Sequence, residues 1–407
     1  MKTTTKVILN IIVGVFLLAS CSSEEVEEVT PENRFIKIYN HPDFSATHYA
    51  LDVKQTADNG YIMLAQSRVT ESDFGGIYLI KADAEGNVLW EYAADATVVS
   101  PAPALMNING GYYFMCMDNT GLGTFLMQVN EAGATADIVR VYPDITYPLH
   151  ASATPDGGIL VLSYNRDRTS STLSKINASF GISWQENYRV QEESADEPIF
   201  DHLLNTDKRL PFFTGVMETG DYFFNGLTNF TLALSFVDPT NGSQQGVMNG
   251  FRLDGAVSAV QHIQGSTFAV SRYTFGTNYI LPGVEIATDG ISNSEDLEGN
   301  ISAELATNAD VRILRTTVDT TNLLVYAANS KSNQVVLYGY DENNGELLGS
   351  KHLGFSEGFE VAGIIETSDK GMAILCTTNV AGRFRRLALF KISEGDVKTL
   401  AGKDTDS

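Results

Sequence analysis

Histidine is the residue type in this sequence best suited to catalysis or metal binding, and its spacing argues against both. The six histidines lie far apart and form no HxH or HExxH pair. The chain also lacks a GxSxG motif, a phosphate-binding loop and a dinucleotide-binding glycine motif. His48 and His150 are a pair that a fold built from distant strands could bring together. We therefore expect no catalytic residue, no bound metal and no cofactor, and a role in binding instead.

Arginine beside an aromatic residue is the combination that best suits ligand or partner binding here. The chain has 27 Lys plus Arg against 50 Asp plus Glu, yet arginines recur in irregular segments between apolar runs. Arg with Tyr or Phe nearby is common in interfaces and in sites for sugars or carboxylates. The alternative is that these segments are polar only because they are exposed. The candidate binding residues are His48, Tyr49, Arg68, His150, Arg166, Arg168, Arg272, Tyr273 and Arg383.

The acidic balance of the chain excludes one class of partner. A net charge of −23 repels phosphate backbones, and the basic residues are scattered along the chain. We therefore expect no nucleic acid among the partners. Hydrophobic residues at 43% and aromatic residues at 10% supply ample material for a packed core, which excludes global disorder as well.

Cys21 is the residue whose surroundings indicate a covalent modification. An apolar run at 7–18 has the length of a secretory signal core and is too short to span a bilayer. The run ends in the tetrad LASC at 18–21, which resembles the lipobox of bacterial lipoproteins. This resemblance implies that residues 1–20 are a signal peptide and that Cys21 carries fatty acyl chains, palmitate among them, that anchor the protein to a membrane.

Residues 21–34 read as an acidic tether between that anchor and the rest of the chain. Ser and Glu dominate it, and its apolar content is too low for folding. A Ser- and Glu-rich patch directly after a lipidated cysteine resembles the export signal of surface lipoproteins in the Bacteroidota. The resemblance implies an outer-membrane protein that faces the cell exterior, and a periplasmic location stays open as the alternative.

The rest of the chain repeats a tight turn followed by a short apolar strand. The copies are about 52 residues apart, which is the spacing of propeller blades and too long for most helical repeats. Asp or Asn followed by Gly, a strong hairpin signal, marks the clearest copies. The seven turns lie at 58–60, 109–111, 156–158, 220–221, 265–266, 321–322 and 369–371.

Each copy continues into further strands joined by hairpins. In the first copy, residues 77–82 and 88–92 are strands on either side of a turn in which Gly86 can take positive φ. Four strands in each of seven copies predict an all-β fold, namely a seven-bladed β-propeller over residues 35–400.

The two ends of this region complement each other. Residues 35–39 alternate as a strand, whereas the last copy reaches only its third strand near the C-terminus. We expect residues 35–39 to supply the outer strand of the last blade, which would close the ring and remove two exposed edges. Residues 401–407 then form a flexible tail.

A Gly-rich turn, an aromatic strand, the strand YLIKAD, the turn EGN and Trp90 together resemble the blades of secreted bacterial β-propeller proteins. The resemblance covers residues 35–400 and implies a fold and no particular activity, because propellers carry unrelated functions. We expect any ligand near the axis, on the face of irregular loops opposite the tight turns.

Two stretches depart from the regular spacing. Residues 186–215 contain DEPIF at 196–200, which reads as a capped short helix or an inserted loop. Residues 281–311 suit an extended outer-strand hairpin. Insertions in repeat folds often carry function, and plain surface decoration is the alternative.

Cys116 and Cys376 each lie inside an apolar run. Both read as small buried core residues, and we expect them to stay unpaired. A disulfide between them is the alternative in an oxidising compartment.

Two functions of different classes remain. The first is a non-catalytic surface lipoprotein that acts as a binding or scaffold propeller, an accessory subunit of an outer-membrane transport, secretion or assembly complex. The second is a glycan-active enzyme (sialidase-like, another glycosidase or a lyase), or a glycan-binding protein, with its site in the axial funnel. Residues 179–184 resemble the Asp-box turn of sialidases, but Ser179 stands where that turn has Asp. Carboxylates clustered in a central pocket would favour the enzyme.

Overall fold

The computed structural model divides the chain into two units, Met1–Asn33 and Arg34–Ser407, and the description below concerns the second. The sequence predictions for the signal peptide, Cys21 and the tether up to residue 32 lie outside the described residues, as do Arg383 and residues 404–407. Among the described residues, no helix is long and apolar enough to cross a membrane. The structure describes residues 33–40, 47–68, 72–191, 196–204, 209–252, 254–355, 358–379 and 384–403.

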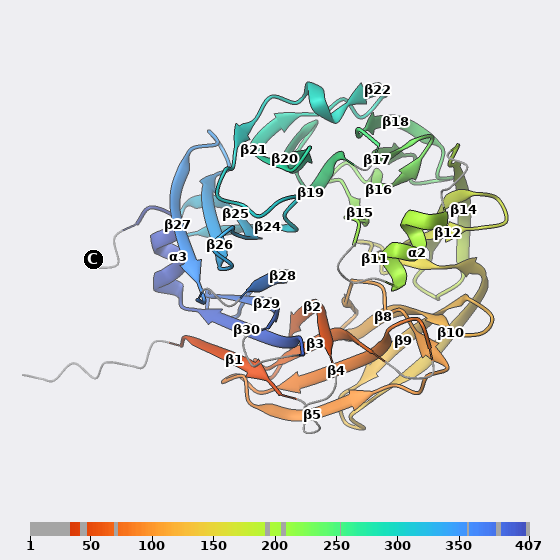
Figure 1. Cartoon of the computed structure of the whole chain (residues 1–407), viewed down its shortest axis with the longest axis horizontal. Coiled ribbons are helices and arrows are strands. Elements are labelled where there is room, and N and C mark those ends of the chain that lie inside the picture. Colours follow the sequence, from red (N-terminus) through yellow and green to blue (C-terminus); the bar gives the residue numbers. More distant parts are fainter. Residues whose placement is uncertain are drawn as a thin grey trace, which may run out of the picture. The chain divides into compact units, whose positions relative to one another are not determined.

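The second unit is all-β apart from short helices, and its sheets are built from strands that follow one another in sequence. One sheet has the order β11-β12-β13-β14, with antiparallel neighbours throughout. Its strands are β11 (Pro148–Ala153), β12 (Ile159–Asn165), β13 (Ser170–Ile176) and β14 (Ile182–Arg189). In Figure 1 the sheets surround a common centre, and the first strand of each set lies innermost.

The other sheets follow the same plan. Strands β2 (His48–Gln55), β3 (Tyr61–Ser67), β4 (Gly76–Ala82) and β5 (Val88–Ala93) form one set, and β7 (Met106–Ile108), β8 (Gly111–Asp118), β9 (Gly123–Asn130) and β10 (Thr135–Thr146) form another. The short β6 (Val98–Val99) joins these two sets into a nine-stranded sheet. The remaining sets are β15 (Phe213–Val216), β16 (Tyr222–Thr228), β17 (Thr231–Val237) and β18 (Gln244–Asn249); β19 (Gly255–Gln264), β20 (Thr267–Thr274) and β21 (Thr277–Glu285); β24 (Val311–Val318), β25 (Thr321–Asn329), β26 (Val335–Asp341) and β27 (Leu347–Leu353); and β28 (Phe359–Glu366), β29 (Met372–Thr378) and β30 (Arg386–Ile392).

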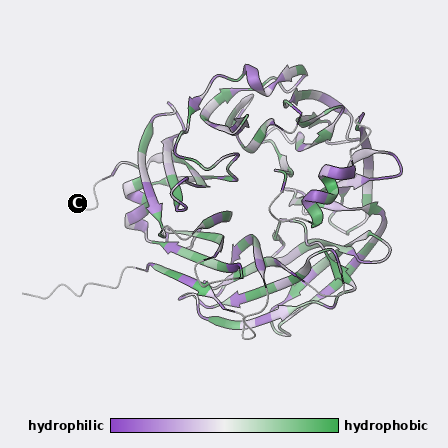
Figure 2. Cartoon of the chain, viewed as in Figure 1, coloured by the Kyte–Doolittle hydropathy of each residue, from purple (hydrophilic) through white to green (hydrophobic). Residues whose placement is uncertain are grey.

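The core lies between neighbouring sheets, which explains the composition of the strands. The middle strands of a set are covered on both faces, so every residue of β13 and nearly every residue of β12 is buried. The outer strand β14 is covered on one face and is largely exposed on the other. Figure 2 accordingly shows much of the hydrophobic colour along the strands. Aliphatic and aromatic residues in adjacent strands therefore join the sheets without any disulfide among the described residues.

Three of the turns between the first two strands of a set are each held by a buried lysine. Lys175, on β13 and 4% exposed, donates to Thr154 Oγ1 at 2.8 Å and to Asp156 Oδ1 at 2.9 Å in the turn between β11 and β12. Partial burial opposes ionisation of Asp156, but its hydrogen bonds with Thr154 and Lys175 outweigh that effect and lower its pKa to about 2. Lys81 with Asp58, and Lys391 with Asp369, repeat this arrangement.

The side of the unit that carries these turns, at 56–60, 154–158 and 367–371, is called the turn side below, and the opposite side is the loop side. The described N-terminus lies on the turn side. In β1 (Phe35–Tyr39), Phe35 pairs with Lys391 of β30, beside the 367–371 turn, and the sheet order is β1-β30-β29-β28. Strand β1 thus occupies the outer position predicted for residues 35–39. Helix α3 (Glu394–Leu400) follows β30, and its Asp396 forms an ion pair with Arg34 at 3.3 Å.

The segment 281–311 differs from the expected hairpin. Its strand β22 (Gly290–Asn293) pairs in parallel with β18 of the neighbouring set, and β23 (Asn300–Ile301) returns to pair with β21. The 3-10 helix η2 (Ser294–Asp296) lies between them. The segment therefore spans two sheets, because β22 pairs with an edge of one sheet and β23 pairs with an edge of the other.

The 186–215 stretch contains helix α2 (Asp196–Leu204), one of the two structures considered for it. Asp196, at its first turn, accepts hydrogen bonds from Tyr164 Oη and Arg166 Nε, each at 2.7 Å. These bonds fix the start of the helix to the loop-side end of the β12–β13 hairpin. Figure 2 shows both hydrophilic and hydrophobic residues on this helix, and Ile199, His202 and Leu203 are its buried ones.

Cys116 and Cys376 are both buried and free, as expected. Burial raises the pKa of each thiol. Both therefore act as core residues and not as reactive groups.

Candidate functional site

A cavity of about 530 Å³ lies at the centre of the ring of sheets, where their innermost strands face one another. Strands β2, β11, β15, β19, β24 and β28 each contribute residues, and segments 103–107 and 209–212 complete the lining. The cavity is thus built by parts of the chain that are far apart in sequence. Its volume is within the range of small-molecule sites.

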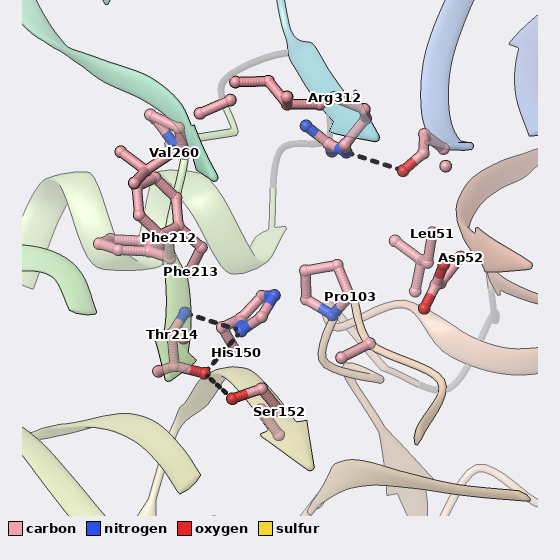
Figure 3. A pocket seen from close by; sticks show the side chains of 18 of the residues that line it. Leu51, Asp52, Pro103, His150, Ser152, Phe212, Phe213, Thr214, Val260 and Arg312 are labelled. Carbon is pink, nitrogen blue, oxygen red and sulfur yellow. Dashed lines mark hydrogen bonds between the residues drawn. The ribbon is translucent and has the colours of Figure 1, made fainter. Parts of the chain in front are cut away.

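His150 on β11 projects into this cavity, and its tautomer is fixed by the neighbouring strand (Figure 3). The backbone N–H of Thr214 donates to His150 Nδ1 at 3.2 Å, so Nδ1 carries no proton and Nε2 carries it. Thr214 Oγ1 also lies 3.2 Å from Nδ1 and donates to Ser152 Oγ at 2.8 Å. Burial, and next the positive charge of Arg312, lower the pKa of His150 to about 4. At neutral pH the side chain is an uncharged donor.

Arg312 on β24 is the cation that faces His150 across the cavity in Figure 3. Its Nε donates to the Ala362 carbonyl at 2.9 Å, and its Nη1 donates to the Val311 carbonyl at 3.0 Å. No partner for Nη2 is found within the described part of the chain. The guanidinium is therefore held through two of its three nitrogens, and Nη2 keeps its donors.

Asp52 on β2 is a cavity carboxylate whose oxygens are already engaged. Lys54 Nζ donates to its Oδ2 at 2.9 Å, and the Leu105 and Val53 backbone N–H groups donate to Oδ2 and Oδ1, each at 2.8 Å. Asp52 is therefore paired with a cation and hydrogen-bonded through both oxygens, which makes it poorly suited to act as a nucleophile or a general base.

Two further groups reach the cavity from the α2 side. His202 of α2 accepts the Leu210 N–H on Nδ1 at 2.9 Å, and burial lowers its pKa to about 3. Arg209 donates to Gln66 Oε1, and its buried Nε has no hydrogen-bond partner among the described residues. Burial lowers the pKa of Arg209 to about 10, and Asp310, which also lines the cavity, acts in the opposite direction.

Of the residues that the sequence singled out, His150 lines this cavity and Tyr49 lines a smaller pocket that shares Arg209 and Arg312 with it. His48 is buried and stacks on Tyr78 with ring centroids 4.2 Å apart, so it does not join His150. Tyr273 is buried in the core between sheets.

Those predicted arginines that the structure describes are scattered over the loop side. Arg166 pairs with Asp196, and Arg272 is buried under the 281–311 segment, where its Nη2 donates to the Leu297 carbonyl at 2.7 Å. Arg68 and Arg168 are exposed. Arg383 lies outside the described residues. The arginines that line the cavity are Arg209 and Arg312, which sequence reasoning did not select.

No cluster of three or more His, Cys, Asp or Glu side chains that could hold a metal ion is found within the described ranges. The cavity instead combines donors from His150 and Arg312 with the apolar side chains of Leu51, Phe213 and Val260 (Figure 3). Such a mixture suits a small molecule that has one charged or polar end and a less polar body.

Comparison with known proteins identifies the fold and no family. No family model and no curated protein matches the chain. Among solved structures, an oligogalacturonate lyase in complex with manganese has a TM-score of 0.51 at 13% identity over 89% of this chain and 97% of that one. Hydrazine synthase from Kuenenia stuttgartiensis has a TM-score of 0.50 at 11% identity over 84% and 95%. The β-propeller domain of the Trilobed protease from Pyrococcus furiosus has a TM-score of 0.44 at 10% identity over 86% and 95%.

These identities are too low to carry an activity from any of those proteins to this chain. The fold is all-β, its antiparallel sheets are mostly four-stranded, and its structural neighbours include β-propeller proteins.

Proposed function

We propose that this chain is a lipid-anchored, non-catalytic binding protein of the outer membrane, whose central cavity holds a small ligand. The observation that carries the proposal is the cavity itself, because the innermost strands of distant sheets converge there on His150 and Arg312 with donors directed inward. Engagement of both Asp52 oxygens by Lys54 and two backbone N–H groups favours binding over acid–base catalysis.

The scaffold in this proposal is a seven-bladed propeller closed by its N-terminal strand. Division of the nine-stranded sheet at β6 gives seven sets of strands, each of which begins at the central cavity. The pairing of β1 with β30 supports closure, because it joins the two ends of the chain in one sheet. A rigid ring of this kind would keep the cavity geometry fixed.

The proposed anchor is Cys21, after removal of residues 1–20. Twelve residues lie between Cys21 and Arg34, so this stretch spans at most about 45 Å when extended. Arg34 lies on the turn side beside Asp396, so the proposed tether would join the described unit on its turn side. The loop side, with the exposed Arg68 and Arg168, is the surface we assign to partners in a membrane complex.

A thermal-shift screen of anionic, neutral and cationic small molecules tests the binding function. The matched control is Val260→Trp, which fills the cavity from β19 with a larger apolar side chain. We expect at least one class to raise the melting temperature of the wild type and not that of the variant. Equal responses of the two proteins, or no response from either, would reject the central cavity as a ligand site.

A further inference from the structure

We propose that the ligand of the central cavity is a small organic acid, whose carboxylate lies between the Arg312 guanidinium and the Nε2–H of His150. This inference rests on the proposed function, and it adds the chemical class of the ligand and the residues that select it.

The first support is the available Nη2 of Arg312, for which the described residues supply no partner. Two backbone carbonyls, of Ala362 and Val311, accept from Nε and Nη1, which fixes the plane of the guanidinium. Because the plane is already fixed, the unpaired Nη2 can bind a ligand without further loss of side-chain entropy. A carboxylate accepts from such a guanidinium nitrogen through short charge-assisted hydrogen bonds.

The second support is the donor that faces it. The Thr214 N–H bond to His150 Nδ1 leaves the proton on Nε2, and the low pKa keeps this ring neutral at pH 7. His150 therefore offers one N–H to the cavity and no acceptor. A cationic ligand would meet donors on both sides, whereas a carboxylate has acceptors for both of them.

The third support is the balance of charge around the cavity. Lys54, Arg209 and Arg312 line it against Asp52 and Asp310, three positive groups against two negative ones, in a chain whose net charge is −23. Lys54 and Asp52 neutralise each other at 2.9 Å. The cavity therefore has a positive surplus within an acidic chain, and this surplus attracts an anion.

The apolar part of the lining determines which kind of ligand body can pack beside the carboxylate. Phe213 and Val260 lie on the wall near His150, with Leu51 and Pro103 on the other side in Figure 3. A body with flat or aliphatic faces can pack there while the carboxylate is held by the two donors. Inorganic anions have no such body, so we expect them to bind weakly.

The test uses pairs of compounds that differ only in charge. Titration calorimetry at pH 7 compares benzoate with benzamide and D-glucuronate with D-glucuronamide, and inorganic phosphate is the third probe. We expect at least one acid to bind about tenfold or more tightly than its amide, and phosphate to bind more weakly than that acid. Arg312→Met should abolish the preference, and Arg140→Met, at an exposed arginine on β10, should keep it.

Each other result has a defined meaning. If an amide binds as tightly as its acid, or phosphate binds as tightly as the acids, the carboxylate assignment is wrong although the cavity remains a ligand site. If the acid preference persists in a folded Arg312→Met protein, Arg312 does not select the ligand. The comparison of acid with amide on the wild type decides the class even if the variant does not fold. If no probe binds, and the thermal-shift screen does not separate wild type from Val260→Trp, the proposed function itself fails.

Discussion

At the scale of single residues, the cavity holds two imidazoles in their neutral form. His150 and His202 accept backbone N–H groups on Nδ1, and burial is the main cause of their low pKa values, about 4 and about 3. Both groups are uncharged at neutral pH, and protonation of either would place a cation beside Arg312 or Arg209.

This arrangement predicts a pH dependence of stability. Between the ordinary histidine pKa, about 6.5, and the lowered values, the unfolded chain binds more protons than the folded one, so stability falls as the pH falls through that window. Urea unfolding at a series of pH values should show a smaller loss between about pH 6.5 and 4 for His150→Phe than for the wild type. Parallel curves for the two proteins would mean that His150 is not held neutral.

The site could be predicted from sequence only in part. The sequence predicts His150 as one of two histidines that distant strands could bring together, and His150 does line the cavity. Arg312 is absent from the sequence prediction because the predicted arginines were those of irregular segments. Arg312 instead lies near the start of an innermost strand. The sequence signal that could have identified cavity residues was charge inside short apolar strands, as at Asp52 and Lys54. Which of them face the centre depends on the register of distant strands, which no local pattern contains.

At the scale of elements, the lysine-held turns lead us to predict that loss of the aspartate costs more stability than loss of the lysine. Asp156→Ala leaves the buried Lys175 ammonium without its counter-ion and should cost about 2 kcal/mol or more of unfolding free energy. Lys175→Met replaces the ammonium with an apolar group of similar length and should lie within about 1 kcal/mol of the wild type. Denaturant unfolding of both variants and of the double variant measures the coupling. Equal costs for the two single variants would show that burial of the lysine is unimportant.

The N-terminal strand gives a second prediction at this scale. Strand β1 covers the edge of β30, and Tyr39 Oη donates to the Gly86 carbonyl of the first set at 3.1 Å. Deletion of residues 35–39 exposes that edge and should lower the melting temperature by several degrees or more, as measured by calorimetry. Removal of the five tether residues 24–28 is the matched control. A melting temperature that is unchanged by the first deletion would contradict closure through β1.

The strands were more predictable than the insertions. Turn chemistry repeated at a regular distance marks hairpins, and the strands after the turns at 58–60, 156–158 and 369–371 lie where the sequence predicted them. The segment 281–311 does not follow such a pattern. Its strand β22 pairs with β18, a partner from another sheet, so its place depends on a long-range contact.

At the scale of the whole molecule, the proposal separates the side of attachment from the side of recognition. The described N-terminus lies on the turn side, whereas α2 and the hairpin of Arg168 lie on the loop side. Cys21→Ala should move the protein from the membrane fraction to the soluble fraction with an unchanged melting temperature, as judged by fractionation and calorimetry. Retention in the membrane fraction would show that another feature attaches the chain.

The claim that a small acid binds at the centre of the ring is tested most directly by the imidazole nitrogens of His150. NMR of ¹⁵N-labelled protein, with His150→Phe to assign the signals, should show the Nε2–H tautomer at pH 7. Titration with the acid that binds in calorimetry should then shift the Nε2 resonance in the wild type and leave it unchanged in Val260→Trp. A His150 resonance that stays unmoved while the acid binds would contradict the account and would place the site elsewhere on the protein.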